Sequence, residues 1–280
     1  MKYKKFLQEA GIRPRKSLGQ HFLHDENIAN NIVEAAYIKK TESVVEVGPG
    51  LGILTERLLE KTPNLTVIEK DSKMQEALRE RFSDAIRQDQ LKILCDDALK
   101  VDWKTFPKEL VVVSNLPYQI STPILFLFID LGDQIDRMVL MFQKEVGDRL
   151  LAKPGTKAYG VLSVLVQLCF EIRKCFVVPS SAFFPAPKVT SIVLSFSRRP
   201  KPAAEINDEQ LFKKVVKAAF GTRRKTLLNA LKRSFPELGR ESLGWISKVS
   251  GVDLKRRGET LSLQEFASLT NAIREKIDVQ

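Results

Sequence analysis

Five short runs of apolar, β-branched residues limit how this chain can fold more than any other feature of its sequence. They span residues 43–48, 64–70, 91–97, 110–117 and 136–143. Each run is apolar through most of its length, as strands are when both faces of a parallel sheet are covered. Stretches with helical spacing follow at 52–61, 73–86, 121–131 and 144–152. Strand and helix in alternation predict a doubly wound α/β sheet.

The pattern changes after residue 160. Residues 160–170 are expected to form another covering helix, and 174–179 and 190–197 to form two further strands with a proline-rich loop between them. A short connection favours an antiparallel pair. We therefore expect a mostly parallel, seven-stranded sheet with an antiparallel strand at one edge.

The last part of the chain is predicted to be a small helical domain. Residues 198–208 are polar and contain two prolines, as linkers commonly do. From residue 209 onward the apolar positions follow helical spacing, and no strand pattern returns. Further helices are expected within 222–235, 244–251 and 262–277. This places an α/β domain at 1–200 and an all-helical domain at 201–280.

The charge of the chain favours a polyanionic partner. The net charge is +11 and the pI is about 9.5. Residues 1–16 carry six Lys or Arg against one acid, and residues 201–280 carry sixteen against ten. Nucleic acid and an anionic membrane surface both suit such a charge. A lysine-rich surface that only confers solubility is the simpler alternative.

Several classes of protein are disfavoured by composition. The three cysteines are scattered and the histidines number only two, so we expect neither a disulfide framework nor a metal site. No apolar run is long enough to cross a membrane, and the N-terminus lacks the apolar segment of a secretory signal. We expect a cytoplasmic protein, with a monomer as the default state.

A glycine-rich turn follows the first predicted strand. Gly48, Gly50 and Gly52 form a G-x-G-x-G pattern between a strand and a helix. Glycine lets the backbone adopt positive φ and approach a ligand closely. The dinucleotide pattern is G-x-G-x-x-G, so the third glycine here comes one residue early, and proline occupies position 49. Such a stiff turn suits a cofactor without a pyrophosphate.

Acidic residues end the next two predicted strands. Glu69 ends the second strand, where a carboxylate can accept the ribose hydroxyls of an adenosine-containing ligand. Asp96 or Asp97 ends the third strand and can accept from an adenine amino group. Asp71 is expected to cap the following helix. Ligands of open α/β sheets bind outside the carboxyl ends of the strands, where these acids and the glycine turn meet.

The fourth predicted strand ends in Asn115, Leu116, Pro117 and Tyr118. This sequence resembles the motif of amino-group methyltransferases. An aromatic amine is a weak nucleophile, and the Asn115 oxygen and the Pro117 carbonyl can accept its two N–H groups and favour a pyramidal nitrogen. Proline presents its carbonyl rigidly, and Tyr118 offers a face for stacking a base. Catalysis is expected to rest on positioning and electrostatics.

Segments along nearly the whole chain resemble the rRNA adenine dimethyltransferases, and above all the bacterial small-subunit branch of that family. They are KSLGQHFLHD (16–25), EVGPGLGILT (46–55), QKEVGDRL (143–150), YGVLSVLVQ (159–167), FFPAPKVTSIV (183–193) and FGTRRKTLLNAL (220–231). The resemblance implies a class I methyltransferase, Rossmann-like fold and S-adenosyl-L-methionine as cofactor. It further implies dimethylation of two adjacent adenosines in the 3′-terminal hairpin loop of 16S rRNA in the 30S subunit, and a role in ribosome biogenesis.

The resemblance also assigns roles to residues. His21 and Leu23 would close over the methionine part of the cofactor, and Gly48 would approach it by its backbone, next to Gly50. Glu69 would bind the ribose and Asp97 the adenine, while Asn115 would bridge cofactor and target base. Phe183 would stack on the target adenine opposite Tyr118. His21 departs from the asparagine that many members of the family carry. The cofactor and catalytic set is therefore His21, Leu23, Gly48, Gly50, Glu69, Asp97, Asn115, Leu116, Pro117, Tyr118 and Phe183.

Five cations are expected to contact RNA on the same grounds: Lys144, Arg149, Arg223, Arg224 and Lys225. Without the resemblance, all five would be solvated surface charges, and Phe183 a core aromatic.

Other functions are compatible with parts of the sequence. The nearest alternative is a 23S rRNA adenine methyltransferase of the macrolide-resistance type, against which the GQHFL and FGTRRKTL segments argue. A mitochondrial transcription-factor relative would share the fold, but no transit-peptide composition supports it. A nicotinamide dehydrogenase is disfavoured by the early third glycine and by the Asn-Leu-Pro-Tyr motif. A ribosome-assembly factor that acts mainly by binding is the non-enzymatic alternative.

We predict that reversing Arg223, Arg224 and Lys225 to glutamate weakens RNA binding and flattens its dependence on salt, because phosphate contacts release counterions. Titrating small-subunit RNA at several salt concentrations measures both quantities. An unchanged affinity and slope would make these three residues solvated surface charges.

Overall fold

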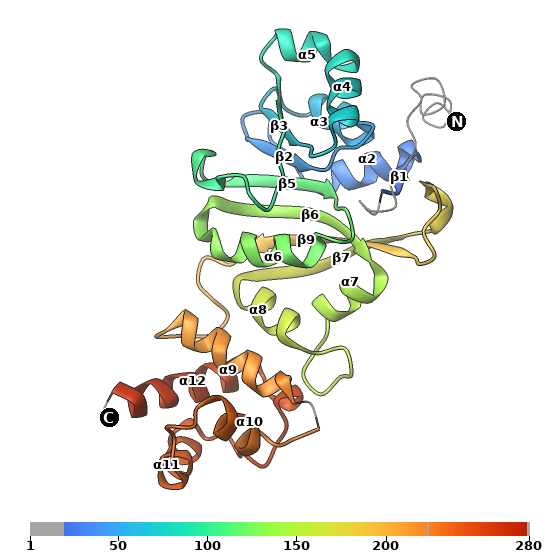
Figure 1. The fold of residues 1–280 in the computed structure, drawn as a ribbon. Coiled ribbons are helices and arrows are strands. Elements are labelled where there is room, and N and C mark those ends of the chain that lie inside the picture. The colour runs from blue at the N-terminus through green and yellow to red at the C-terminus, as the bar shows by residue number, and fades with distance from the viewer. Residues whose placement is uncertain (1–19, 223, 279–280) are drawn as a thin grey trace. The chain divides into compact units, whose positions relative to one another are not determined.

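The computed structural model describes residues 20–222 and 224–278 (Figure 1). Residues 16–19 of the N-terminal motif and Arg223 therefore lie outside the described part of the chain. The chain divides into two compact units. The first holds the described residues up to Gly147 together with 171–198, and the second holds 148–170 and 199 onward. The domain boundary expected at residue 200 stays a prediction.

The first unit is built on a seven-stranded sheet in the order β4-β3-β2-β5-β6-β9-β7. The strands are β2 (Val44–Val47), β3 (Leu65–Ile68), β4 (Leu91–Leu94), β5 (Leu110–Asn115), β6 (Ile135–Gln143), β7 (Phe170–Val178) and β9 (Ser191–Arg198). The pairs from β4 through β6 are parallel, and β9 is antiparallel to β6. The predicted fold class, a mostly parallel seven-stranded α/β sheet with a helical C-terminal part, is confirmed.

The antiparallel strand takes a different place from the one expected. β9 pairs with β6, with Leu140 opposite Leu194, and β7 lies outside it. The antiparallel strand is therefore second from the edge. β9 is buried along most of its length, whereas β7 carries the exposed charged residues Glu171, Arg173 and Lys174, which suit a strand at the edge of the sheet.

Helices follow the strands of the first unit, as the alternating pattern predicts. They are α2 (Glu26–Glu34), α3 (Ile53–Leu59), α4 (Ser72–Arg81), α5 (Ser83–Arg87), α6 (Ser121–Asp130) and α7 (Lys144–Leu150). The single helix expected at 73–86 is wrong, because Phe82 leaves helical geometry with φ −112° and ψ 27°. This break places the Phe82 ring against Gly52. Two short strands, β1 (Phe22–Leu23) and β8 (Phe183–Phe184), form a separate antiparallel pair.

Burial on both faces explains the continuous apolar runs. Val67 of β3, Val111 of β5 and Val139 of β6 belong to one buried cluster with Ile32 of α2 and Leu54 of α3. Alternate strand residues point to the opposite face, where α6 lies: Arg198 of β9 donates to the carbonyl of Phe128, and the Phe128 ring meets Trp103 edge to face at 5.1 Å. The sheet thus forms the middle layer between helices.

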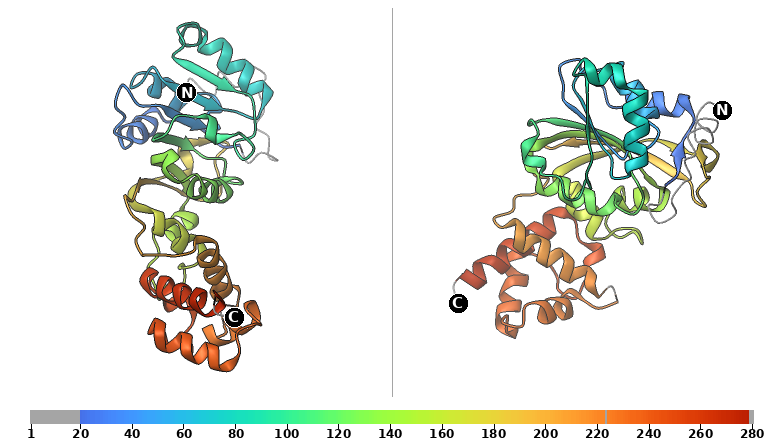
Figure 2. Two further views of the ribbon diagram at one scale, coloured as in Figure 1. Left: turned by 90° about the vertical axis from the view of Figure 1, so that its left-hand side faces the viewer. Right: turned by 45° about the horizontal axis from the view of Figure 1, so that its top comes forward.

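The second unit is helical in its C-terminal part, as both views of Figure 2 show. Its helices are α8 (Val161–Cys169), α9 (Glu209–Gly221), α10 (Leu227–Ser234), α11 (Arg240–Ser250) and α12 (Leu263–Asp278). Phe220 of α9 packs against Tyr159 and against Phe266 of α12, with ring centroids 5.9 Å apart in each pair. Across the described residues, none of the helices combines the length and apolar character needed to span a bilayer.

We predict that Gly147→Ala lowers the free energy of unfolding by about 1–3 kcal/mol, because an added methyl group overfills the core. A Cβ atom on Gly147 of α7 would lie 2.2 Å from a methyl carbon of Ile192 in β9. Denaturant unfolding of the whole chain measures the change. Gly244→Ala is the matched control, since its helix position is open, and it should stabilise the protein by up to about 1 kcal/mol. Equal effects of the two substitutions would contradict the prediction.

Candidate active site

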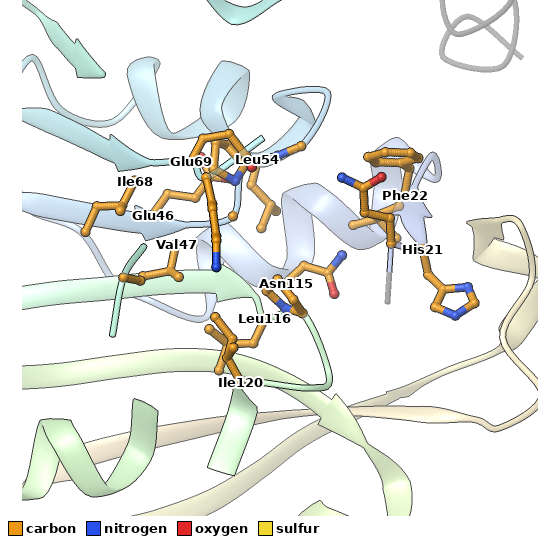
Figure 3. Close-up of a pocket in the computed structure, with 18 of the residues that line it drawn as sticks. His21, Phe22, Glu46, Val47, Leu54, Ile68, Glu69, Asn115, Leu116 and Ile120 are labelled. Carbon is orange, nitrogen blue, oxygen red and sulfur yellow. Dashed lines mark hydrogen bonds between the residues drawn. The ribbon is translucent and has the colours of Figure 1, made fainter. Parts of the chain in front are cut away.

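A pocket opens beside the carboxyl ends of β2, β3 and β5 in the first unit (Figure 3). All seven residues expected to bind the cofactor line it, and so do Leu116, Pro117 and Tyr118. In the sequence these residues are spread from position 21 to position 118, and the parallel strands bring them together. Their expected roles stay predictions, but their convergence on one cavity is what a binding site requires.

The glycine turn forms one wall of the pocket through very close packing. Gly48, Gly50 and Gly52 all have positive φ, at 64°, 54° and 76°. A Cβ atom on Gly48 would lie 3.1 Å from the ring carbons of Pro117, and one on Gly52 would lie 2.5 Å from the Phe82 ring. Both the dihedral angle and the space therefore demand glycine at these positions.

Glu69 is held in place by backbone donors. Its carboxylate accepts from the N–H of Gly50 at 3.2 Å and from the N–H of Asp71 at 2.8 Å. Burial raises the pKa of Glu69, while these two hydrogen bonds oppose the increase. Because a carboxylate has about four acceptor positions, it can still accept from a ligand hydroxyl. Asp71 caps α4 by accepting from the N–H of Lys73, as expected.

Asp97 also lines the pocket. Its carboxylate accepts from the N–H of Leu99 and from the Lys70 ammonium, both at 3.0 Å. These contacts lower the pKa of Asp97, with the Leu99 hydrogen bond as the larger cause. The neighbouring Asp96 is exposed and also lines the pocket. Asp97 is thus an ionised acceptor whose position is fixed by two partners.

Asn115 ends β5 and directs its carboxamide toward the pocket (Figure 3). Among the described residues, no hydrogen bond to this carboxamide is found. The Pro117 carbonyl accepts from the N–H of Ile120 at 3.0 Å, which leaves one of its lone pairs open. The buried Ser114 donates to the carbonyl of Val47 at 2.5 Å and so ties the ends of β5 and β2 together. The motif therefore presents two hydrogen-bond acceptors, the Asn115 carboxamide oxygen and the Pro117 carbonyl oxygen, on a backbone segment that the Ser114 hydrogen bond holds in place.

Tyr118 is fixed by its hydroxyl group. The hydroxyl lies 2.6 Å from the hydroxyl of Ser191, which is fully buried in β9. Burial raises the pKa of Tyr118. The His21 ring lies 5.8 Å from the Tyr118 ring, and its Nδ1 is 2.7 Å from the carbonyl oxygen of Pro185. These contacts join three segments that are distant in the sequence at one edge of the pocket: the segment of His21, the segment of Tyr118, and the segment that holds Pro185 and Ser191.

The pocket brings together the residues expected to bind an adenosine-containing cofactor and those expected to orient an amine. The family model described as ribosomal RNA adenine dimethylase matches residues 11–274. The chain belongs to this family. The predicted family and the predicted reaction class, methyl transfer by an enzyme, are confirmed.

Individual members of the dimethylase family are similar over nearly their whole length. Ribosomal RNA small subunit methyltransferase A of Geobacter metallireducens is 45% identical over 272 residues, covering 95% of this chain and 98% of that protein. The protein of the same name from Bacillus mycoides is 41% identical, with 96% and 94% covered. A crystal structure of a dimethyladenosine transferase from Plasmodium falciparum superposes with a TM-score of 0.77 at 27% identity, over 91% of this chain and 98% of that one. The 23S rRNA methyltransferase ErmE shares the fold, with a TM-score of 0.68 at 23% identity, over 90% and 99%.

Phe183 is the one predicted catalytic residue that does not line this pocket. Its side chain is 3% exposed and lies in the core cluster, opposite Leu23 in the β1–β8 pair. Stacking on a target base would require the ring to leave this packing, so that role stays a prediction.

The cations expected to contact RNA lie outside the pocket. Lys144 and Arg149 are exposed on α7, and Arg224 and Lys225 are exposed in the turn between α9 and α10. Their RNA contacts stay predictions. In the described ranges, no group of three or more acidic, His or Cys residues is placed to hold a metal ion.

Glu46 is a buried acid of the pocket that the sequence interpretation missed. It sits in the middle of β2, is 2% exposed, lines the pocket, and accepts from the Thr55 hydroxyl at 2.6 Å. Burial raises its pKa to about 8, and the nearby Glu69 contributes in the same direction. A single acid inside an otherwise apolar strand was the available signal, because such a residue is costly to bury.

We predict that Glu46 makes the protein less stable as the pH rises from about 5 to 8. Below the unfolded pKa of 4.5 both states are protonated, so the group costs nothing; as the pH rises towards 8, only the unfolded state ionises and the folded state loses relative stability. Glu46→Gln removes this titration. Its free energy of unfolding should exceed that of the wild type by an amount on the order of a few kcal/mol at pH 8 and match it near pH 4.5.

Unfolding by denaturant at several pH values, without cofactor, measures the difference. Glu76→Gln on the exposed face of α4 is the control and should follow the wild-type pH profile. A parallel pH profile of wild type and Glu46→Gln would show that Glu46 does not titrate in this range.

Proposed function

We propose that this enzyme transfers methyl groups from S-adenosyl-L-methionine to the N6 amines of two adjacent adenosines in the 3′-terminal hairpin loop of 16S rRNA. The observation that carries the proposal is the convergence of the glycine turn, Glu69, Asp97 and the 115–118 motif on one pocket. The family match and the names of the full-length relatives support the choice of substrate. We propose further that the enzyme acts as a cytoplasmic monomer on the 30S subunit.

The pocket fits the proposed cofactor by the chemistry of its lining. Glu69 would accept the ribose hydroxyls, and Asp97 the adenine amino group. Gly48 would approach the methionine part with its backbone, under a cover formed by His21 and Leu23. When bound, the cofactor supplies an electrophilic methyl group on a positive sulfur. A cationic ligand in this pocket would favour ionisation of the buried Glu46, whose pKa burial raises to about 8.

Asn115 and Pro117 would orient the target amine. The free carboxamide oxygen of Asn115 and the open lone pair of the Pro117 carbonyl would accept its two N–H groups, so that the nitrogen lone pair faces the methyl group. Tyr118, held by Ser191, would stack on the base. The base has to leave its stack in the hairpin to reach the pocket. Phe183 would form the second stacking face once displaced from the core.

We expect Asn115→Ala to lower methyl transfer by at least about a hundredfold, because one of two preorganised acceptors is lost. RNA affinity should stay near wild type, since phosphate contacts elsewhere dominate binding. Asn115→Asp is the matched control: it keeps an acceptor oxygen of the same size and should retain more activity than the alanine variant.

The assay uses labelled S-adenosylmethionine and small subunits that lack adenine dimethylation, followed by mapping of the modified nucleotides. Dimethyladenosine at two adjacent positions of the 3′-terminal hairpin supports the proposal. Label in large-subunit RNA would replace it by the 23S-type activity. Full turnover in Asn115→Ala would refute the assigned mechanism.

A further inference from the structure

Glu46 is a buried acid of the pocket that has no part in orienting the target amine or the adenosine. It lines the pocket although the residue is only 2% exposed. The hydroxyl of Thr55, a fully buried residue of α3, donates to its carboxyl group at 2.6 Å. Among the described residues, no other hydrogen bond and no ion pair engages this carboxyl group. One hydrogen bond offsets only part of the cost of burying a carboxylate, which has about four acceptor positions.

The surroundings of Glu46 offer no positive charge within the described residues. Val67 of β3 stands directly beside it in the sheet, and the β5 residues that pair with β2 are valines. Glu69, at the end of β3 and on the same side of the pocket, adds a like charge (Figure 3). The other ionisable side chains that line the pocket are His21, Lys70, Asp96, Asp97 and Tyr118.

These surroundings keep Glu46 protonated at neutral pH. Burial raises its pKa to about 8, the Glu69 carboxylate acts in the same direction, and the Thr55 hydroxyl opposes both. A group with such a pKa releases its proton when a positive charge comes close, because an opposite charge favours the ionised form. Glu46 is therefore able to respond to the charge of a molecule in the pocket.

The proposed reaction changes the charge of that molecule. The bond between sulfur and the methyl carbon breaks, and its electron pair stays on sulfur, so that a cationic sulfonium becomes a neutral thioether. The target nitrogen forms the new bond to the methyl carbon and loses a proton to solvent. S-adenosylmethionine and its product, S-adenosylhomocysteine, share the adenine, ribose, amino and carboxyl groups. The charge on sulfur is therefore the main difference between the molecule to be bound and the molecule to be released.

We propose that Glu46 makes the pocket distinguish the methyl donor from the demethylated product by the charge on sulfur. Glu46 releases its proton to solvent when the sulfonium binds, and it takes up a proton again when the sulfur has become neutral. The preference for the donor then increases with pH, because only the sulfonium is attracted by the ionised carboxylate. The inference rests on the proposed function, since both ligands belong to the proposed reaction.

The affinities of full-length wild type and Glu46→Gln for the two ligands, measured by calorimetry, test the proposal. The ratio of the product Kd to the donor Kd should rise about fivefold in the wild type from about pH 6.5 to about pH 8.5. A rise of this size follows if the donor lowers the pKa of Glu46 by about one unit from its value of about 8. In Glu46→Gln the ratio should stay constant. The ratio cancels the titration of the amino group that both ligands carry.

The same calorimetry in buffers of different ionisation enthalpy counts the protons released on binding. Near neutral pH the wild type should release more protons with the donor than with the product, whereas Glu46→Gln should release equal numbers. Thr55→Val is a second variant that leaves the acid in place. It removes the hydrogen bond that favours ionised Glu46, so the rise of the ratio should move to higher pH.

Glu76→Gln on the exposed face of α4 is the control, and its ratio should follow the wild-type profile. Circular dichroism and the unfolding midpoint identify any variant that fails to fold. A ratio that does not change with pH in the wild type, or changes equally in Glu46→Gln, would overturn the proposal and leave the cofactor in place. Failure of the wild type to bind either ligand would reject the proposed cofactor and this inference with it.

Discussion

Close contact between glycine backbone and neighbouring rings is the constraint on which the pocket depends. A Cβ atom on Gly48 would lie 3.1 Å from the Pro117 ring, so the turn after β2 lies close to the motif after β5. A Cβ atom on Gly52 would lie 2.5 Å from the ring of Phe82, the residue that separates α4 from α5. A methyl group at either position would therefore force the neighbouring ring to shift. Because protein interiors transmit such displacements, the whole arrangement of acceptors around the cavity rests on the absence of side chains in this turn.

Most of the fold follows from sequence because burial on both faces leaves a strong local signal. The runs that form β2 through β6 were predicted within a few residues, and so was the helical C-terminal part. The order of β7 and β9 in the sheet was not predicted. Strand pairing depends on contacts between segments that are distant in the sequence, and the apolar pattern of one strand does not specify its partner. The split at Phe82 was missed because helical spacing continues through it, and the proximity of its ring to Gly52 is a tertiary contact that this spacing does not show.

The candidate site was predictable where motifs specify backbone geometry, and less so where packing decides. Asn115 and Glu69 follow predicted strands, and parallel strands bring their ends together. Glu46 was missed although it is a single acid in an otherwise apolar strand, because the sequence does not show which face of β2 borders the cavity. Phe183 was predicted from its motif to contact the target base, but the structure buries its side chain in the core, opposite Leu23.

The pairing of β1 with β8 has a mechanical consequence. Phe22 and Leu23 stand opposite Phe184 and Phe183, and the N–H of His24 donates to the carbonyl of Ala182 at 3.0 Å. The segment beside His21 and the segment that carries Phe183 are therefore one two-stranded flap and not two independent covers. Lifting either strand alone would break backbone hydrogen bonds to the other, so any opening of the flap would move both strands together. Exchange of a molecule under its first strand and exposure of the aromatic ring on its second would then share a single motion.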